Sequence, residues 1–263
     1  METGQPYLMP NKNKILQNND VALHFFKDGF YCCKPSEIVF IPTDKSSNDL
    51  NKSLNLYLNS EVQENLNEIS IILFQNPSTF VPLSLFDKSL SNRYLNLYDR
   101  PKNKEVFAYD SLNEIKQVNV YSYPIYIYTV LKESKINFNL LHYNTILYRQ
   151  VVNISSSIKS NYQLFIHFQY KSIDVFLTSE SKVKFNNRFS VKNEDEFLYY
   201  LFFVVEQFNL AKDEYELIFL GRIKSFENYY KTVSKYHNDI RFIDQEKNKI
   251  LDLQIHKAPY LAI

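Results

Sequence analysis

The stretch Asn193–Asn209, NEDEFLYYLFFVVEQFN, decides how the rest of the chain must pack. Asn193 is suited to cap a helix, and Glu196, three residues later, completes a capping box. The first turn is acidic, which the helix dipole favours. Every residue from Phe197 to Val205 is apolar or Tyr, and a helix that is apolar all round is buried on more than one side. The run is shorter than the roughly 20 residues of a membrane span, so we expect an internal helix wedged between a sheet and a second layer.

The composition is that of a globular protein without a strong electrostatic bias. The 263 residues are 45% hydrophobic and 22% charged, with a net charge of +1. A chain of this length lies where single cores begin to split in two. Near-neutral charge argues against a nucleic-acid or anionic-lipid partner. The polar residues 1–20 resemble a flexible lead and lack the apolar core of a signal peptide, and the chain has only two Cys. We therefore expect a cytoplasmic protein without disulfides or a transmembrane segment.

Two residue counts are unusual. The chain has 21 Tyr and 21 Phe but no Trp, and Gly occurs three times. A preference for AT-rich codons explains this composition without any function. Loops that wrap phosphate groups nevertheless need Gly, because the backbone must approach the ligand closely and φ is often positive. The chain therefore has few glycines from which a phosphate-binding loop could be formed.

The first half alternates strands and helices. Strands are predicted where apolar residues alternate or run continuously between turn signals: Val21–Lys27, Phe30–Cys33, Glu37–Ile41, Ile69–Phe74, Val106–Tyr109, Ile115–Tyr121 and Phe138–Leu141. The dipeptide Asp28-Gly29 is a strong hairpin turn. Helices are predicted around Leu50–Leu58, from about Pro82 to Tyr98, over Ile125–Glu133 and over Thr145–Ser155.

The second half repeats this order. Three strands, Tyr162–Phe168, Ser172–Leu177 and Val183–Phe189, precede the opening helix, and a covered strand (Tyr215–Leu220), a helix (Phe226–Tyr236) and a short strand (Ile240–Ile243) follow it. Both halves thus follow the order β-β-β-α-β-α, with first strands 162 − 21 = 141 residues apart. We predict an α/β protein of two duplicated lobes with mixed sheets, at residues 21–158 and 159–263.

This repeated order resembles the actin-like ATPase fold, also described as ribonuclease H-like. The segment Leu217–Ile223 is similar to that superfamily's strand-then-Gly turn at the adenosine. The chain from Val21 onward also resembles an uncharacterised bacterial family, known only as a domain of unknown function with an actin-like ATPase fold. The phrases that carry this resemblance are Lys184–Phe189, Glu194–Tyr200 and Leu220–Ile223.

The resemblance implies where a nucleotide would bind, and the match to those motifs is incomplete. Members that hydrolyse ATP carry an Asp on the first strand of each half and a Gly-containing turn after it. The candidate cleft positions are the first-strand turns and the turn at the adenosine: Asp28, Gly29, Gln169, Lys171, Gly221 and Arg222. Asp28-Gly29 is explained equally well as a plain hairpin turn. The second turn has neither Asp nor Gly, and His167 and Gln169 are not a natural ligand set for a hard cation.

Other chemistry finds little support. Cys32 and Cys33 are adjacent on a strand and lack zinc-ligand spacing. No catalytic residue or metal site is predicted, and the nucleotide motifs are degenerate, so ATP and Mg²⁺ are expected only under an alternative. We expect an interaction or scaffold protein with an unknown protein partner, similar to the actin-like component of type IV pilus assembly. The alternative is an ATPase or small-molecule kinase of the same superfamily, and the charge balance argues against a nucleic-acid binder.

Overall fold

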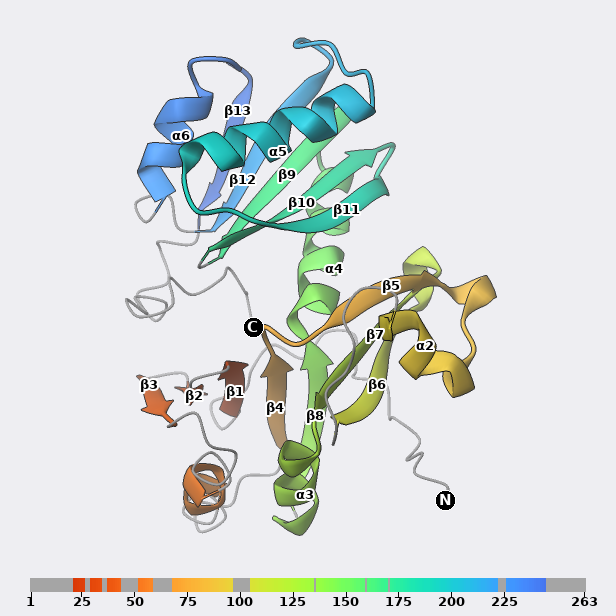
Figure 1. Ribbon diagram of the computed structural model, residues 1–263, viewed down its shortest axis with the longest axis vertical. Coiled ribbons are helices and arrows are strands. Elements are labelled where there is room, and N and C mark those ends of the chain that lie inside the picture. Colours follow the sequence, from red (N-terminus) through yellow and green to blue (C-terminus); the bar gives the residue numbers. More distant parts are fainter. Residues whose placement is uncertain are drawn as a thin grey trace. The chain divides into compact units, whose positions relative to one another are not determined.

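The computed structural model describes residues 21–26, 29–34, 37–43, 52–58, 68–96, 105–134, 136–158, 160–169, 171–221 and 226–244. The chain forms two compact units, of which the first ends at Thr145 and the second begins at Ile146 (Figure 1). The predicted lead at residues 1–20 lies outside the described residues. The predicted boundary between residues 158 and 159 stays a prediction.

The first unit contains a five-stranded mixed sheet in the order β3-β2-β1-β4-β8. Its strands are β1 (Val21–Phe26), β2 (Gly29–Lys34), β3 (Glu37–Pro42), β4 (Glu68–Leu73) and β8 (Asn137–His142). The first three strands are antiparallel, and β4 and β8 run parallel to β1. One face of the sheet packs against a helix at residues 52–58 and against α3 (Ile125–Glu133) in a common apolar core. The predicted helix at Ile125–Glu133 is therefore confirmed.

A three-stranded antiparallel sheet follows β4, in the order β5-β7-β6. Its elements are β5 (Ser78–Pro82), two 3₁₀ turns (Leu83–Leu85 and Lys88–Leu90), α2 (Ser91–Asn96), β6 (Glu105–Leu112), a 3₁₀ turn (Asn113–Ile115) and β7 (Gln117–Pro124). The predicted continuous helix from about Pro82 to Tyr98 is wrong in extent, because only Ser91–Asn96 is α-helical among the described residues of this range. The carboxylate of Asp87 accepts hydrogen bonds from both the backbone N–H and the hydroxyl of Ser89, each at 2.8 Å. Such local bonds compete with a continuous helix.

The second unit repeats the mixed sheet in the order β11-β10-β9-β12-β13. Its strands are β9 (Tyr162–Gln169), β10 (Ser172–Ser179), β11 (Lys182–Ser190), β12 (Tyr215–Gly221) and β13 (Ile240–Asp244). Strands β9 to β11 are antiparallel, and β12 and β13 run parallel to β9. The two sheets share one strand order and one pattern of directions. The predicted α/β fold of duplicated lobes is therefore confirmed, with the three-stranded sheet inserted into the first.

Helices cover both faces of the second sheet. On one face, α5 (Glu194–Gln207) and α6 (Glu227–Val233) pack on the strands in a single apolar core (Figure 1). On the other face lies α4 (Tyr143–Ser156), whose Tyr148 ring meets Phe176 edge-on and whose Ser155 hydroxyl bonds Thr178 at 2.9 Å. Among the described helices, none is long and apolar enough to span a bilayer.

Helix α5 begins as predicted but is not the internal wedge that its composition suggests. The Asn193 side chain accepts a hydrogen bond from the Glu196 N–H at 2.9 Å, which caps the helix. Only the stripe Phe197, Leu201 and Val204 is fully buried. The Tyr199 side chain is 65% exposed and Phe203 is 41% exposed. The prediction of burial on opposite sides is therefore wrong, because one stripe of the helix is enough to close the core over the sheet.

Candidate functional site

Candidate site positions lie on the first hairpin of each sheet, and each hairpin is described within its own unit. In the second unit, Gln169 at the end of β9 pairs with Ser172 at the start of β10. In the first unit, Phe26 at the end of β1 pairs with Gly29 at the start of β2. His24 and His167 each lie two residues before the pair that closes the hairpin. The two histidines therefore occupy equivalent positions of the duplicated sheet.

The second-unit hairpin gathers a buried polar cluster that spans three strands. Asp174 on β10 pairs in register with His167 on β9 and with Arg188 on β11. Residues directly opposite each other in a sheet point to the same face, as do residues two apart on one strand. Gln169 therefore joins them. This face is opposite the one that carries Phe168, which packs into the core under α5 and α6.

Three side chains of this cluster that can donate hydrogen bonds surround the Asp174 carboxylate. The Gln169 amide donates to Oδ2 at 2.5 Å, and Arg188 Nε donates to Oδ1 at 2.8 Å. His167 Nδ1 lies 3.2 Å from Oδ2. The Asp174 side chain is 5% exposed and that of Arg188 is 31% exposed. Burial lowers the pKa of Arg188 to about 10, so its guanidinium is charged at neutral pH and compensates the buried carboxylate.

Three predicted site residues lie at one end of this sheet. Gln169 ends β9, and Lys171 occupies the turn with a left-handed φ of 61°. Gly221 ends β12, whose Leu220 pairs with His167 in parallel register. The carboxyl ends of parallel strands are where open α/β sheets bind ligands. Arg222, the fourth residue predicted in this half, lies outside the described residues.

In the first unit, Gly29 has a structural reason to be glycine. Its φ is +152°, and an added Cβ would clash with the backbone oxygen of Ile41 and lie 2.7 Å from the Phe40 ring. The residue is therefore required by the close approach of β3, and its presence does not depend on a ligand. Asp28, the other residue predicted at this turn, lies outside the described residues.

The polar cluster is not repeated at the His24 position. His24 pairs with Tyr31, where the second unit has Asp174. Its Nε2 atom has no hydrogen-bond partner, and its ring lies 5.3 Å from that of Phe74. Burial without compensation lowers the pKa of His24 to about 3, so this side chain is neutral in the folded protein.

A second buried cluster, which the sequence does not reveal, joins the inserted sheet to β8 and to the first turn of α4. The carboxylate of Asp110 accepts hydrogen bonds from the Tyr121 hydroxyl at 2.9 Å, the His142 N–H at 3.0 Å and the Thr145 hydroxyl at 2.6 Å. The Asn119 amide donates to the Thr145 hydroxyl at 2.9 Å. These bonds hold four elements together, so we assign the cluster a structural role.

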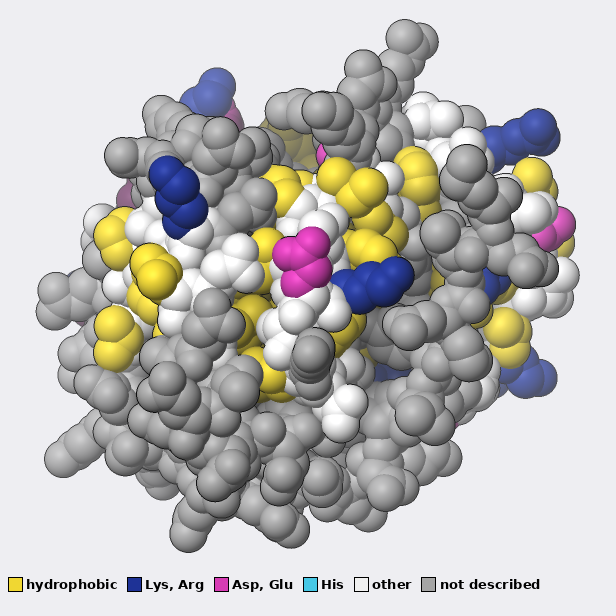
Figure 2. Space-filling view, turned by 90° about the horizontal axis from the view of Figure 1, so that it is seen from below, with side chains coloured by type: hydrophobic (Ala, Val, Ile, Leu, Met, Phe, Trp, Pro, Cys, Tyr) yellow, Lys and Arg dark blue, Asp and Glu magenta, His cyan; other side chains and the backbone are white. Residues whose placement is uncertain are grey.

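Metal-ligating and nucleic-acid-binding features are sparse in the described residues. They contain no group of three His, Cys, Asp or Glu side chains placed to hold a metal ion. Cys32 and Cys33 are buried, and the Cys32 Sγ lies 2.5 Å from the Tyr57 hydroxyl. On the face shown in Figure 2, the Lys and Arg side chains of the described residues stand apart from one another. A nucleic-acid site would gather them into a basic stripe.

Comparison with solved structures shows the actin-like ATPase fold. A Bacteroides thetaiotaomicron VPI-5482 protein with this fold and unknown function is similar with a TM-score of 0.69 and 17% identity, over 86% of this chain and 91% of that chain. The PilM–PilN type IV pilus biogenesis complex is similar with a TM-score of 0.55 and 10% identity, over 86% of this chain and 88% of that chain. At these identities the likeness concerns the fold alone.

Comparison of the sequence with family models identifies a family whose function is unknown. A family model described as "Protein of unknown function (DUF3822)" matches residues 29–240. No curated protein matches the sequence.

Proposed function

Because this chain belongs to the DUF3822 family of proteins of unknown function, its role must be argued from its own residues, and we propose that it is a non-catalytic interaction or scaffold protein on a degenerate actin-like ATPase fold. The proposal has two parts. The first part is that the hairpins which would hold a nucleotide have a structural role instead. The second part is that the protein acts by binding another protein.

The observation that carries the first part is the environment of Asp174. A hard cation such as Mg²⁺ is bound by several oxygen ligands, usually including one or two carboxylates. At the second-unit hairpin, the carboxylate of Asp174 is buried and engaged by Gln169 and the charged Arg188. Recruiting it to a metal would compete with its hydrogen bond from the charged Arg188 Nε. The cluster is therefore suited to stabilising the hairpin and poorly suited to binding the metal ion of a nucleotide.

The packing of Phe168 supports the same conclusion. The ring of Phe168 is almost fully buried and stacks on Phe226 with centroids 4.6 Å apart. It also lies 5.3 Å from Phe197 and 5.0 Å from Tyr229. Backbone that wraps phosphate groups approaches them most closely at glycine. Here the residue next to Gln169 is instead anchored in the core by a large side chain.

The second part rests on analogy and on the surface of the protein. One structure of the same fold is a complex of PilM with PilN, which is an instance of this fold engaging another protein. Function does not follow from fold alone. The chain adds its own support, because Tyr199, Phe203 and Tyr236 expose large aromatic side chains in the second unit.

The test is a thermal-shift titration of the full chain with Mg-ATP. A ligand present at 100 times its Kd stabilises the folded state by about 2.7 kcal/mol. For a domain of 150–250 residues this is a rise in melting temperature of roughly 5–10 °C. We expect no shift with millimolar Mg-ATP in the wild type. Titration without Mg²⁺ is the control for non-specific binding of the anion.

A nucleotide-binding enzyme of the same superfamily is the outcome that would replace this proposal. It requires a reproducible, Mg²⁺-dependent rise in melting temperature that is lost in Asp28→Ala. Lys231→Ala is a matched surface control, because Lys231 forms an exposed ion pair with Glu227 at 2.7 Å. A rise that persists in Asp28→Ala and disappears in Lys171→Ala would instead indicate binding of the phosphate groups at the second-unit turn.

A further inference from the structure

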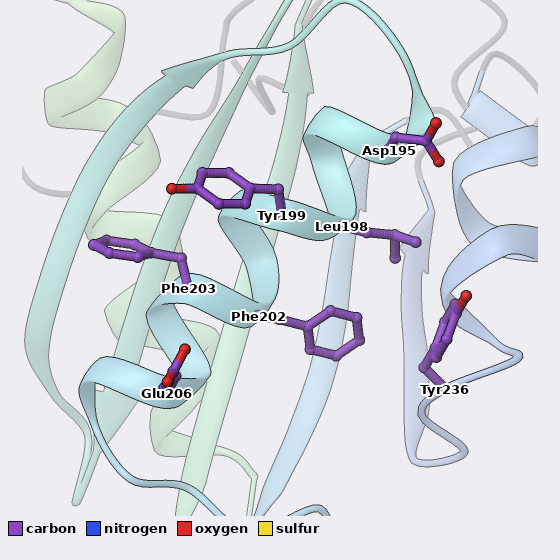
Figure 3. A pocket seen from close by; sticks show the side chains of 7 residues that line it. All are labelled: Asp195, Leu198, Tyr199, Phe202, Phe203, Glu206 and Tyr236. Atoms are coloured by element: carbon purple, nitrogen blue, oxygen red, sulfur yellow. The ribbon is translucent and has the colours of Figure 1, made fainter.

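Helix α5 and the turn after α6 line an open aromatic groove on the surface of the second unit (Figure 3). Its volume is about 510 Å³. The side chains that matter here are four aromatic residues and two acids: Tyr199, Phe202, Phe203, Tyr236, Asp195 and Glu206. Tyr199, Phe203 and Tyr236 are 65%, 41% and 51% exposed. Single exposed apolar residues are ordinary, whereas these three exposed aromatic residues line one groove.

The aromatic rings of the groove support one another. The Tyr199 and Phe203 rings are stacked with centroids 6.3 Å apart, and Phe202 meets Tyr236 edge-on at 5.7 Å. Figure 3 shows the first pair on one side of α5 and the second pair on the side that faces α6. Tyr and Phe are enriched at protein interfaces, because they supply a large contact area with few rotatable bonds.

The charge around the groove is negative at both ends. The helix EDEFLYYLFFVVEQ contains four acidic residues and neither Lys nor Arg. Asp195 and Glu206 lie 11 positions apart on it, which is roughly 16 Å at the rise of an α-helix. Among the described residues, neither makes an ion pair, whereas Glu196 lies 3.7 Å from Lys192. The α5 side of the groove therefore disfavours anionic lipid and nucleic acid.

The same charges argue against a second copy of this chain on the groove. If two α5 helices packed in parallel, Asp195 would meet Asp195. If they packed in opposite directions, Asp195 would meet Glu206. Like charges brought together at an interface disfavour the pairing, so the groove is complementary to a basic partner and not to itself.

We propose that this groove binds an amphipathic helical segment of a partner protein, with apolar side chains between two Lys or Arg residues spaced roughly 16 Å apart, or 11 positions along a helix. The apolar side chains lie on the aromatic rings, and the two cations lie against Asp195 and Glu206. The proposal rests on the interaction role proposed above and names the surface and the partner chemistry.

The test uses a matched pair of dye-labelled helical peptides of about 18 residues and the full chain. The first peptide carries Lys at two positions 11 apart, with Leu and Phe at i+4, i+7 and i+8 between them. The second replaces both Lys with Glu. By fluorescence anisotropy at low salt, we expect the basic peptide to bind and the acidic peptide to bind at least tenfold more weakly. Binding of the basic peptide should weaken as salt is raised.

Variants locate the site. Tyr199→Ala and Phe203→Ala should each weaken binding of the basic peptide roughly tenfold, as hot-spot aromatic residues do. Leu85→Ala removes a side chain that is 69% exposed in the other unit and should leave binding unchanged. Asp195→Lys combined with Glu206→Lys should reverse the preference between the two peptides. Circular dichroism of each variant checks that the fold is intact.

Several results would overturn the proposal: no binding of the basic peptide, equal binding of both peptides, or binding that Tyr199→Ala and Phe203→Ala leave unchanged. Self-association in sedimentation experiments that Phe203→Ala abolishes would show that a second copy occupies the groove. The Mg-ATP titration reports separately. If the basic peptide does not bind and Mg-ATP causes no shift, the groove proposal is refuted and the proposed non-catalytic role stands. If the peptide binds and Mg-ATP causes a shift, the groove proposal stands and the non-catalytic role is refuted.

Discussion

Leu201→Asp tests whether α5 closes the core of the second unit with one stripe only. Leu201 is fully buried against the sheet, in the same core as Phe197 and Phe219. Phe203, two positions along the same helix, is 41% exposed. Leu201→Asp and Phe203→Asp therefore place one carboxyl group on opposite sides of one helix, and a one-sided helix predicts very different consequences.

The magnitude follows from burial and ionisation. Removing the buried leucine side chain costs roughly 1.5–3 kcal/mol. The site can hold the new carboxyl group only when it is protonated, because burial raises its pKa. At pH 7, which is roughly three pH units above the ordinary Asp pKa, protonating the carboxylate costs about 1.4 kcal/mol per unit, or roughly 4 kcal/mol in total. The total is comparable with the entire stability of a domain, roughly 5–15 kcal/mol. Phe203→Asp should cost less than about 1 kcal/mol.

The assay is urea unfolding followed by far-UV circular dichroism, because the chain has no Trp for fluorescence. Leu201→Asn is the uncharged control. A folded-state pKa that is raised above the unfolded value makes Asp increasingly unfavourable relative to Asn as pH rises from about 4 towards 7. The two variants should therefore be equally stable near pH 4 and differ by roughly 4 kcal/mol at pH 7. Equal losses for Leu201→Asp and Phe203→Asp would refute the one-sided helix.

Three further expectations concern the first unit. Gly29→Ala should lower stability by roughly 1–3 kcal/mol because of its backbone strain and the clash with Ile41, and a melting temperature equal to the wild type would contradict this. The pKa of His24 falls from 6.5 to about 3 on burial, so the unfolded chain takes up a proton below about pH 6.5 that the folded chain does not. The free energy of unfolding should therefore fall with decreasing pH, by roughly 3 kcal/mol at pH 4.5. His24→Leu should remove this part of the acid sensitivity. Urea midpoints of the wild type and the variant at pH 7.5 and 4.5 measure the difference. Burial and the neighbouring Cys32 raise the pKa of Cys33 to about 12. Its reaction with thiol reagents at pH 8 should therefore be slow in the folded chain and fast in denaturant. Rapid modification of the folded chain would show that the thiol is accessible.

Most of the strand and helix order could be predicted from the sequence, because local signals determine it. Alternating or continuous apolar runs mark the strands, and Asn193 with Glu196 marks the start of α5. The two halves repeat these signals in the same order, from which the duplicated lobes follow. The helix predicted from Pro82 to Tyr98 is not continuous, because the backbone N–H and hydroxyl of Ser89 donate to the Asp87 carboxylate and interrupt the regular backbone there.

Part of the candidate site was visible in the sequence and part was not. Gln169, Lys171 and Gly221 were predicted from the resemblance to the actin-like fold, which indicates the ends of the first strand and of the covered strand as the positions to inspect. Asp174 and Arg188 were missed, because they meet Gln169 only through the register of three strands. Once the pair Gln169–Ser172 is known, counting along the two strands places Asp174 opposite His167.

The sequence by itself determined which segments are apolar, where the turns fall and in what order the elements follow. Only the tertiary structure decided which side of each apolar segment is covered and which buried charge finds a partner. A continuous apolar run such as Phe197–Val205 contains no periodic signal to distinguish the side facing the sheet from the side facing solvent. Burial and pairing are set by residues far apart in the chain, so the exposed groove on α5 and the compensated carboxylate of Asp174 are visible only in the folded protein.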